Sequence, residues 1–169
     1  MKAGKRKLQG FTVIEVLIVL AIIGILAAIA LANFANAMNR SRQKKSMADM
    51  RGMAIAWEAR ATDLGRYNAA GFTFPANSVT FTQLQTALTP TYLKKIPQND
   101  GWGDSLDFGV DFEAWGAASN AQVYAIRSRG RDNAVDPSYV DGTTTRFDCD
   151  IIFSNGSFII YPEGVHLDS

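Results

Sequence analysis

The chain has 169 residues, enough for one modest globular domain with an extension. Its formal net charge of +1 argues against a dedicated nucleic-acid-binding protein, which normally carries a basic excess. A single cysteine, Cys149, permits no intramolecular disulfide, and a single histidine, His166, leaves little material for a Cys/His metal site or a histidine-based catalytic pair.

The N-terminal segment begins basic and then becomes apolar. Residues 1–10 contain no acid and four positive side chains, at Lys2, Lys5, Arg6 and Lys7. Residues 11–32 then read FTVIEVLIVLAIIGILAAIALA, in which only Thr12, Glu15 and Gly24 are not clearly apolar. As a helix this run is about 33 Å long, which matches a bilayer core of about 30 Å. Because a small domain rarely buries a helix that is apolar on all sides, the run predicts a membrane-spanning helix over 11–33 rather than a core helix.

A cleavable secretory signal is the alternative interpretation of such a start. The apolar region of such a signal is normally about 7–15 residues long and is followed by a small-x-small cleavage site. Here the run is longer, and Asn33 and Phe34 follow it before the helical pattern continues. The apolar helix is therefore expected to be retained.

Glu15 is the one charged side chain in the apolar run. A charge at the centre of a membrane helix costs about 2.5–3.5 kcal/mol, and less near the end of the helix, where Glu15 lies. Two interpretations stay open: a tolerated interfacial acid, or a carboxylate that awaits a positive partner.

The hexapeptide GFTVIE at residues 10–15, between a basic leader and an apolar helix, resembles the signal of type IV prepilins and type II secretion pseudopilins. The resemblance implies that a prepilin peptidase cleaves the bond between Gly10 and Phe11 and N-methylates Phe11. It also implies that Glu15 is the assembly residue, whose carboxylate pairs with the Phe11 amine of a neighbouring subunit. Pairing would offset the desolvation of both charges. Many members of this family carry a proline where this chain has Ala32, so one cause of a helix kink is missing.

The helical pattern continues over residues 34–65. Apolar side chains recur every three or four residues, which predicts one apolar stripe. The stripe consists of Met47, Met50, Ala54, Trp57, Ala61 and Leu64. With Gly65 as a stop, the whole helix is expected over residues 11–64, with a length of roughly 80 Å.

A basic cluster lies just after the apolar run, at Arg40, Arg42, Lys44, Lys45 and Arg51. A solvated face or a contact between subunits is favoured for it over lipid or DNA binding. Because both flanks of the apolar run are basic, the positive-inside rule does not set the orientation.

Residues 66–169 are expected to form an α+β head, in which the striped helix packs on a small antiparallel sheet. A short helix is predicted at 81–89, with Thr80 as its N-cap. Strands are predicted at 106–112, 122–127, 150–153 and 157–161. The Asn155-Gly156 pair between the last two is a strong hairpin signal.

The head also resembles the major pseudopilin of type II secretion, in the segments DGWGDSL (residues 100–106) and YAIRSRGRDN (residues 124–133). That family holds a structural calcium ion in its β loops. The resemblance makes four acids the candidate ligands here, Asp132, Asp136, Asp148 and Asp150. Calcium takes 6–8 oxygen ligands, so such a site would also need backbone carbonyls, and plain solvated loop acids are the alternative.

No pattern in the sequence indicates an enzyme. A P-loop and a Gly-x-Ser-x-Gly motif are both missing, and Cys149 lies in a strand pattern with no histidine near it in sequence, which favours a packed thiol. A membrane-anchored periplasmic enzyme is the alternative from a different class. It would require Glu15 to be incidental and the bond after Gly10 to stay uncut.

The predicted function is therefore that of a structural filament subunit. The major pseudopilin of a type II secretion system is favoured, and the major pilin of a surface pilus for adhesion, motility or DNA uptake is the alternative. The resemblance implies a single-pass protein of the bacterial inner membrane with its head in the periplasm. Expected partners are other copies of the chain, the prepilin peptidase, a platform protein, an assembly ATPase, minor pseudopilins and membrane lipid, with no nucleic acid.

Overall fold

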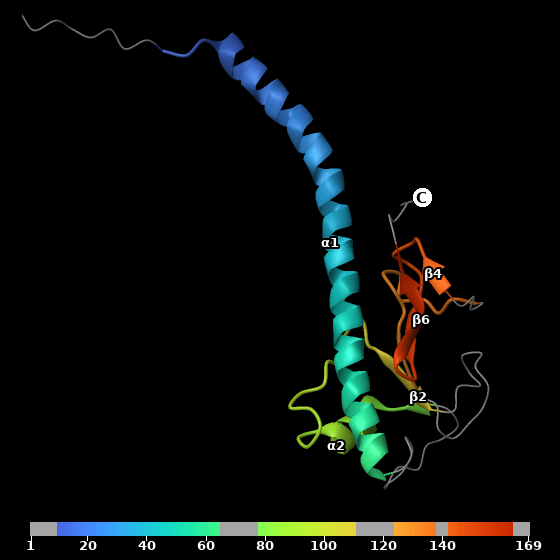
Figure 1. Cartoon of the computed structure of the whole chain (residues 1–169). Coiled ribbons are helices and arrows are strands. Elements are labelled where there is room, and N and C mark those ends of the chain that lie inside the picture. Colours follow the sequence, from blue (N-terminus) through green and yellow to red (C-terminus); the bar gives the residue numbers. More distant parts are fainter. Residues whose placement is uncertain (1–9, 65–77, 111–123, 138–141, 164–169) are drawn as a thin grey trace, which may run out of the picture. The chain divides into compact units, whose positions relative to one another are not determined.

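The computed structural model describes residues 10–64, 78–110, 124–137 and 142–163 (Figure 1). The chain forms two compact units, residues 1–38 and residues 39–169. The helices are α1 (Val13–Leu64) and α2 (Phe81–Leu88). The strands are β1 (Ser78–Val79), β2 (Asp107–Val110), β3 (Tyr124–Ser128), β4 (Gly142–Thr144), β5 (Ile151–Ser154) and β6 (Ser157–Pro162).

The part of α1 in the first unit leaves its apolar side chains uncovered. Every large apolar side chain from Phe11 to Leu31, and Phe34 after them, is at least 48% exposed. The helix continues through residue 32, where many members of the resembled family carry a proline. It is the one helix of the described residues that is long and apolar enough to cross a membrane. A run of this kind needs an apolar environment, because leaving so much apolar surface in water is unfavourable.

In the second unit, α1 presents its apolar stripe to the core of the head. Met50, Ala54, Trp57 and Ala61 are buried as predicted, and Met47 packs at the edge of the same cluster. Leu64 differs from the prediction, because its side chain is 39% exposed at the last turn of the helix. The periodicity that placed it in the stripe holds only while the sheet lies alongside the helix.

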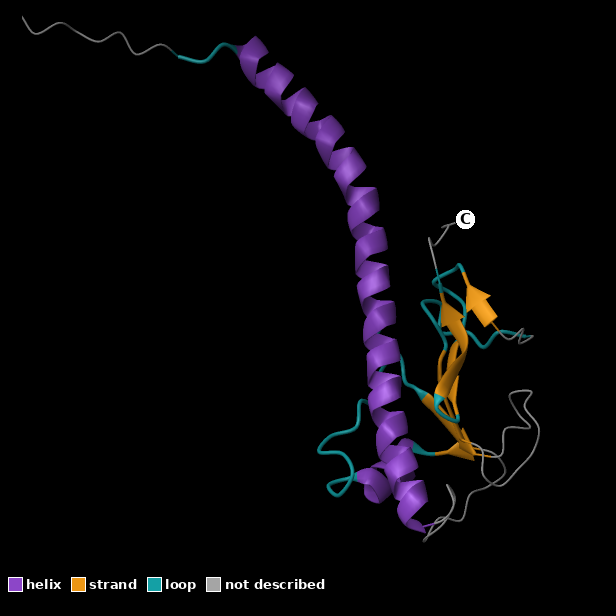
Figure 2. Cartoon of the chain, viewed as in Figure 1, coloured by secondary structure: helices purple, strands orange, loops and turns teal. Residues whose placement is uncertain are grey.

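Six strands form one sheet in the order β1-β2-β3-β5-β6-β4. Figure 2 draws the strands in orange. Neighbouring strands pair antiparallel, except that β4 pairs parallel with β6. The predicted α+β architecture, a long helix on a small and mostly antiparallel sheet, is confirmed.

A row of apolar side chains crosses the sheet from strand to strand. The register aligns Val79, Phe108, Ile126, Phe153 and Phe158 on five neighbouring strands. The first four are buried, and the rings of the last two meet edge-on at 4.8 Å between centroids. This row belongs to the same core cluster as the α1 stripe, so the head is held together mainly by apolar burial.

Local signals in the sequence correspond to local structure. Thr80 caps α2 in a capping box with Gln83, as the N-cap prediction implies. Asn155 and Gly156 both have positive φ, at 44° and 89°, which is the conformation of a tight hairpin turn between β5 and β6.

The strand predictions are correct to within two residues where the chain is described. β2 and β3 fall inside or one residue beyond the predicted ranges, and residues 111–112 and 122–123 lie outside the described residues. The expected stop at Gly65 also lies outside them. Two strands, β1 and β4, were not predicted, because they have only two and three residues and no apolar alternation.

Candidate functional site

The helix α1 begins with a capping box that contains Glu15. The backbone N–H and the hydroxyl of Thr12 both donate to Glu15 Oε2, at 2.8 and 2.7 Å, and the Glu15 N–H donates to the Thr12 hydroxyl at 3.4 Å. The Thr12 carbonyl accepts from the Val16 N–H, which makes Thr12 the N-cap and Glu15 the third helical residue. An acid in the first turn also interacts favourably with the helix dipole.

The capping box places the predicted processing site just before the helix. Gly10, Phe11 and Thr12 precede the first helical residue, and the Phe11 side chain is 85% exposed. The bond between Gly10 and Phe11 therefore has no helical hydrogen bonds to be broken before a peptidase binds it. Cleavage there, methylation of Phe11 and the assembly role of Glu15 stay predictions.

The role of Thr12 was missed by sequence reasoning. The signal was present, because Thr-x-x-Glu ahead of an apolar run is the pattern of a capping box. Within a single chain the Glu15 carboxylate is thus held by Thr12, and a positive partner on a neighbouring chain would meet a carboxylate that is already oriented.

The DGWG segment forms a turn around the buried carboxylate of Asp100. Asp100 Oδ1 accepts three backbone hydrogen bonds, from Trp102, Gly103 and Asp104, at 2.8, 3.0 and 3.1 Å. Its Oδ2 accepts from the Ser128 hydroxyl on β3 at 2.6 Å, so the turn is tied to the sheet.

The same turn is held against α1 by its glycine. The Gly101 N–H donates to the Ser46 hydroxyl at 2.8 Å. A Cβ at position 101 would lie well inside van der Waals contact with the carbonyl of Arg42, so only glycine fits here. Asp100 and Gly101 together connect α1, the turn and the sheet.

The four acids predicted as calcium ligands separate into different contacts. Asp148 forms a bidentate ion pair with Arg131, at 2.7 and 3.1 Å, and the hydrogen bonds from Arg131 lower the pKa of the Asp148 carboxyl. Asp132 accepts from the nearby Ala134 N–H. Asp136 and Asp150 lie together: the Asp136 carboxylate accepts from the Asp150 N–H at 2.8 Å, and the Asp150 carboxylate accepts from the Asp136 N–H at 3.4 Å.

This arrangement does not bring the four acids around one point. Over the described ranges, no three Asp, Glu, His or Cys side chains are close enough to hold a metal ion together. Calcium takes 6–8 oxygens, so the pair of Asp136 and Asp150 would need several carbonyl ligands in addition. The four acids as placed do not converge on one point, and calcium binding stays a prediction.

The Cys149 thiol lies in an environment that disfavours its thiolate. It is half-buried, and burial raises the pKa of the thiol, with the negative charge of Asp136 acting in the same direction. A reactive cysteine needs a lowered pKa, so this environment is that of a packed thiol.

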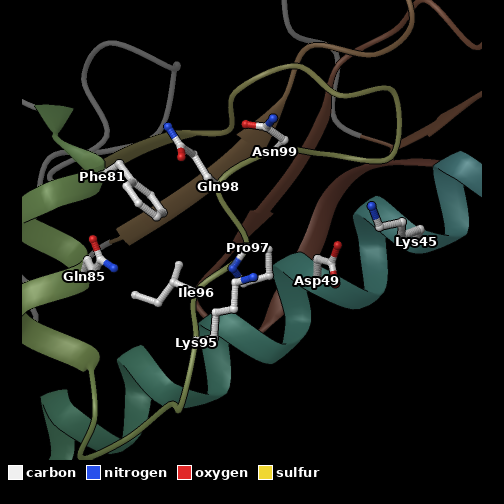
Figure 3. Close-up of a pocket in the computed structure, with 9 residues that line it drawn as sticks. All are labelled: Lys45, Asp49, Phe81, Gln85, Lys95, Ile96, Pro97, Gln98 and Asn99. Carbon is white, nitrogen blue, oxygen red and sulfur yellow. The ribbon is translucent and has the colours of Figure 1, made fainter.

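An open pocket of about 590 Å³ lies among α1, α2 and the segment that follows α2 (Figure 3). Its wall combines charged and apolar side chains with three amides and a proline: Lys45, Asp49, Phe81, Gln85, Lys95, Ile96, Pro97, Gln98 and Asn99. It is wide and mixed in polarity, and it holds none of the predicted site residues.

Comparison with known proteins identifies the N-terminal segment. The family model of the prokaryotic N-terminal methylation motif matches residues 5–31. Comparison with curated proteins gave no match, and comparison with solved structures gave none. The matched residues include the leader cations nearest the helix, the capping box and most of the exposed apolar run.

The methylation motif over residues 5–31, together with the long helix and the α+β head, resembles the arrangement of type IV pilin-like chains. One N-terminal apolar helix in the described part of the chain, together with this motif, indicates a single-pass membrane-anchored protein. The motif implies processing by a prepilin peptidase and polymerisation into a filament.

Proposed function

We propose that this chain is the major subunit of a periplasmic pseudopilus in a type II secretion system. The observation that carries the proposal is the methylation motif over residues 5–31, which ends within the part of α1 whose large apolar side chains are exposed. The DGWG turn and the YAIRSRGRDN segment favour a secretion pseudopilin over a surface pilin, and the lack of a disulfide agrees with this. In this role the head faces the periplasm.

In this proposal the apolar N-terminal part of α1 lies first in lipid and later against other protein helices. Before assembly it lies in the lipid of the inner membrane, where its apolar side chains are favourable. After extraction it packs against the helices of other copies, so the apolar surface is covered by protein instead of lipid. A platform protein, an assembly ATPase and minor pseudopilins are the partners that this step would require.

Glu15 would supply the register between subunits. Removal of the leader creates a cationic amine at Phe11, four residues before the carboxylate. A buried amine or carboxylate alone is strongly disfavoured, whereas the two together offset each other's desolvation. The pair would therefore form only where one subunit is stacked correctly on the next.

Two substitutions at Glu15 separate its charge from its capping role. Glu15→Gln removes the charge and keeps an acceptor for the Thr12 N–H, since glutamine also occupies this position in capping boxes. Glu15→Ala removes both. We expect both variants to insert into the membrane and neither to form filaments, measured by electron microscopy and by shearing of cells that overproduce the protein.

Normal filaments from Glu15→Gln would contradict charge pairing and leave Glu15 with a capping role alone. The choice between a secretion pseudopilin and a surface pilin is tested separately, by deleting the gene. A pseudopilin predicts that proteins normally secreted accumulate in the periplasm of the deletion strain. A strain that secretes normally and instead loses surface fibres would identify a pilin of a surface pilus.

A further inference from the structure

Four positive side chains project from α1 just after the apolar run. Arg40, Arg42, Lys44 and Lys45 are all exposed, and no acid occurs in the sequence between Glu15 and Asp49. We call these four residues the basic collar.

The basic collar differs from four arginines of the sheet and its loops in lacking carboxylate partners. Arg127 and Arg129 share the carboxylate of Asp107, at 2.7 and 2.8 Å. Arg131 and Arg146 likewise share Asp148. None of the four collar side chains forms an ion pair with any residue that the structure describes, Asp49 included.

The collar cations are spread around the exposed side of the helix. At about 100° per residue, the order around the axis is 40, 44, 45 and 42, which covers about 200°. Gln43 and Ser46 lie in the remaining arc, and both are buried, at 4% and 0% exposure. A single neighbouring protein surface would contact a one-sided stripe, whereas a planar surface that the helix passes through can contact all four cations.

The collar begins just beyond the depth of the lipid headgroups. Arg40 and Lys45 follow Phe34 by six and eleven residues, or about 9 and 16 Å along a helix, whereas the headgroup layer extends about 5–8 Å beyond the hydrocarbon, so the long side chains must reach back toward it. Side chains on a helix lean toward its N-terminus, which turns these long cationic side chains back toward the apolar run. Lys45 lies at the rim of the open pocket, which leaves its amine room to move (Figure 3).

We propose that the basic collar binds the anionic headgroups of the leaflet from which the apolar helix emerges. This inference rests on the proposed membrane location of residues 11–33. Each cation near an anionic surface strengthens the attraction on the order of fivefold, and salt weakens it. The lipid partner is thus phosphatidylglycerol or another acidic phospholipid, and the collar would hold the stored subunit at a fixed depth.

The test measures how fast Lys44 and Lys45 react with an amine-acylating reagent. The full chain is placed at one copy per nanodisc, either in pure phosphatidylcholine or in phosphatidylcholine mixed with phosphatidylglycerol, and acylation is read by peptide mass spectrometry. We expect the acidic lipid to slow acylation of both lysines on the order of fivefold and high salt to reverse the effect. Lys94, exposed on the segment after α2, is the internal comparator and is expected to change little.

Matched variants separate charge from structure. Arg40→Gln with Arg42→Gln is expected to weaken the protection of the two lysines, and Arg40→Lys with Arg42→Lys is expected to retain it. Equal rates in the two lipids would overturn the inference. A DNA oligonucleotide that protects the two lysines in neutral nanodiscs more strongly than acidic lipid does would also overturn it, in favour of nucleic-acid binding. Protection that appears only with several copies per disc would overturn it in favour of a contact between subunits.

The two proposals fail separately. A chain that is cleaved at Gly10 and forms filaments, but whose collar lysines react equally in both lipids, refutes only the lipid inference. A chain that does not insert into nanodiscs at all refutes the membrane location on which both proposals depend.

Discussion

Replacing Asp100 with alanine is expected to destabilise the head strongly. The Asp100 side chain is 2% exposed and accepts four hydrogen bonds, three from the turn and one from Ser128. A hydrogen bond to a charged group contributes about 1.5–3 kcal/mol, but the values do not add. Gly103 is exposed, so water can replace part of what the turn loses. The expected loss in the free energy of unfolding is about 3–5 kcal/mol, a large part of the 5–15 kcal/mol typical of a domain.

The assay is urea unfolding of the full chain in detergent, followed by tryptophan fluorescence. A loss of this size lowers the midpoint by about 1–3 M urea. Asp100→Asn keeps Oδ1 for the turn, and its amide can donate to Ser128 when that hydroxyl rotates, so its loss is expected to be about 1–2 kcal/mol. Asp104→Asn is the matched control, because only the backbone N–H and carbonyl of Asp104 take part in the turn.

Equal midpoints for Asp100→Ala and the unmodified chain would refute this reasoning. They would mean that the free energy needed to desolvate the Asp100 carboxylate equals the stabilisation that its four hydrogen bonds provide. A large effect in Asp104→Asn would instead show that the net charge of the turn, rather than the Asp100 hydrogen bonds, decides its stability.

Two further substitutions test the packing and the charge of the head. Gly101→Ala is expected to lower the urea midpoint, since its Cβ would collide with the carbonyl of Arg42, whereas Gly52→Ala, with no atom within 4 Å of the new Cβ, is expected to raise stability by about 1 kcal/mol through helix propensity. A higher urea midpoint for both Gly101→Ala and Gly52→Ala would show that the turn does not lie in close contact with α1. The hydrogen bonds from Arg131 hold the pKa of the Asp148 carboxyl below its ordinary value of about 4. The pair therefore adds fully to the free energy of unfolding at pH values above the ordinary pKa, and this addition is lost as pH falls through the lowered pKa. Asp148→Asn is therefore expected to be less stable than the unmodified chain by about 0.2–1 kcal/mol at neutral pH and equally stable in strong acid; a difference that persists in acid would contradict this.

Much of the fold could be predicted because its signals are local. The apolar run and the stripe that follows it establish α1 by periodicity alone. Thr80 with Gln83, and Asn155 with Gly156, encode a helix start and a hairpin within four residues each. These features depend on neighbouring residues and not on how the chain is arranged in space.

The features that were missed depend on distant partners. β4 pairs with β6 in parallel, and a three-residue strand rich in threonine carries no sign of this in its own sequence. Leu64 continues the stripe in sequence but lies where the core has ended.

The candidate site shows the same division. The motif around Gly10 and Glu15 is contiguous, so the sequence alone was enough to propose it, although the capping role of Thr12 was overlooked. The grouping of the loop acids could not be predicted from the sequence, because it depends on residues that are distant along the chain. Asp148 pairs with Arg131, which is 17 residues away, and Asp136 and Asp150 contact each other although 14 residues separate them. Spacing along the chain does not determine which carboxylate a distant arginine will bind.

Intact-mass spectrometry of the protein from native membranes, followed by fragmentation of its N-terminus, tests the central claim most directly. We predict a chain that begins at Phe11 and carries one additional methyl group on its amine. A chain that still begins at Met1 in cells with an active prepilin peptidase would contradict the assignment and favour a membrane-anchored protein that does not assemble.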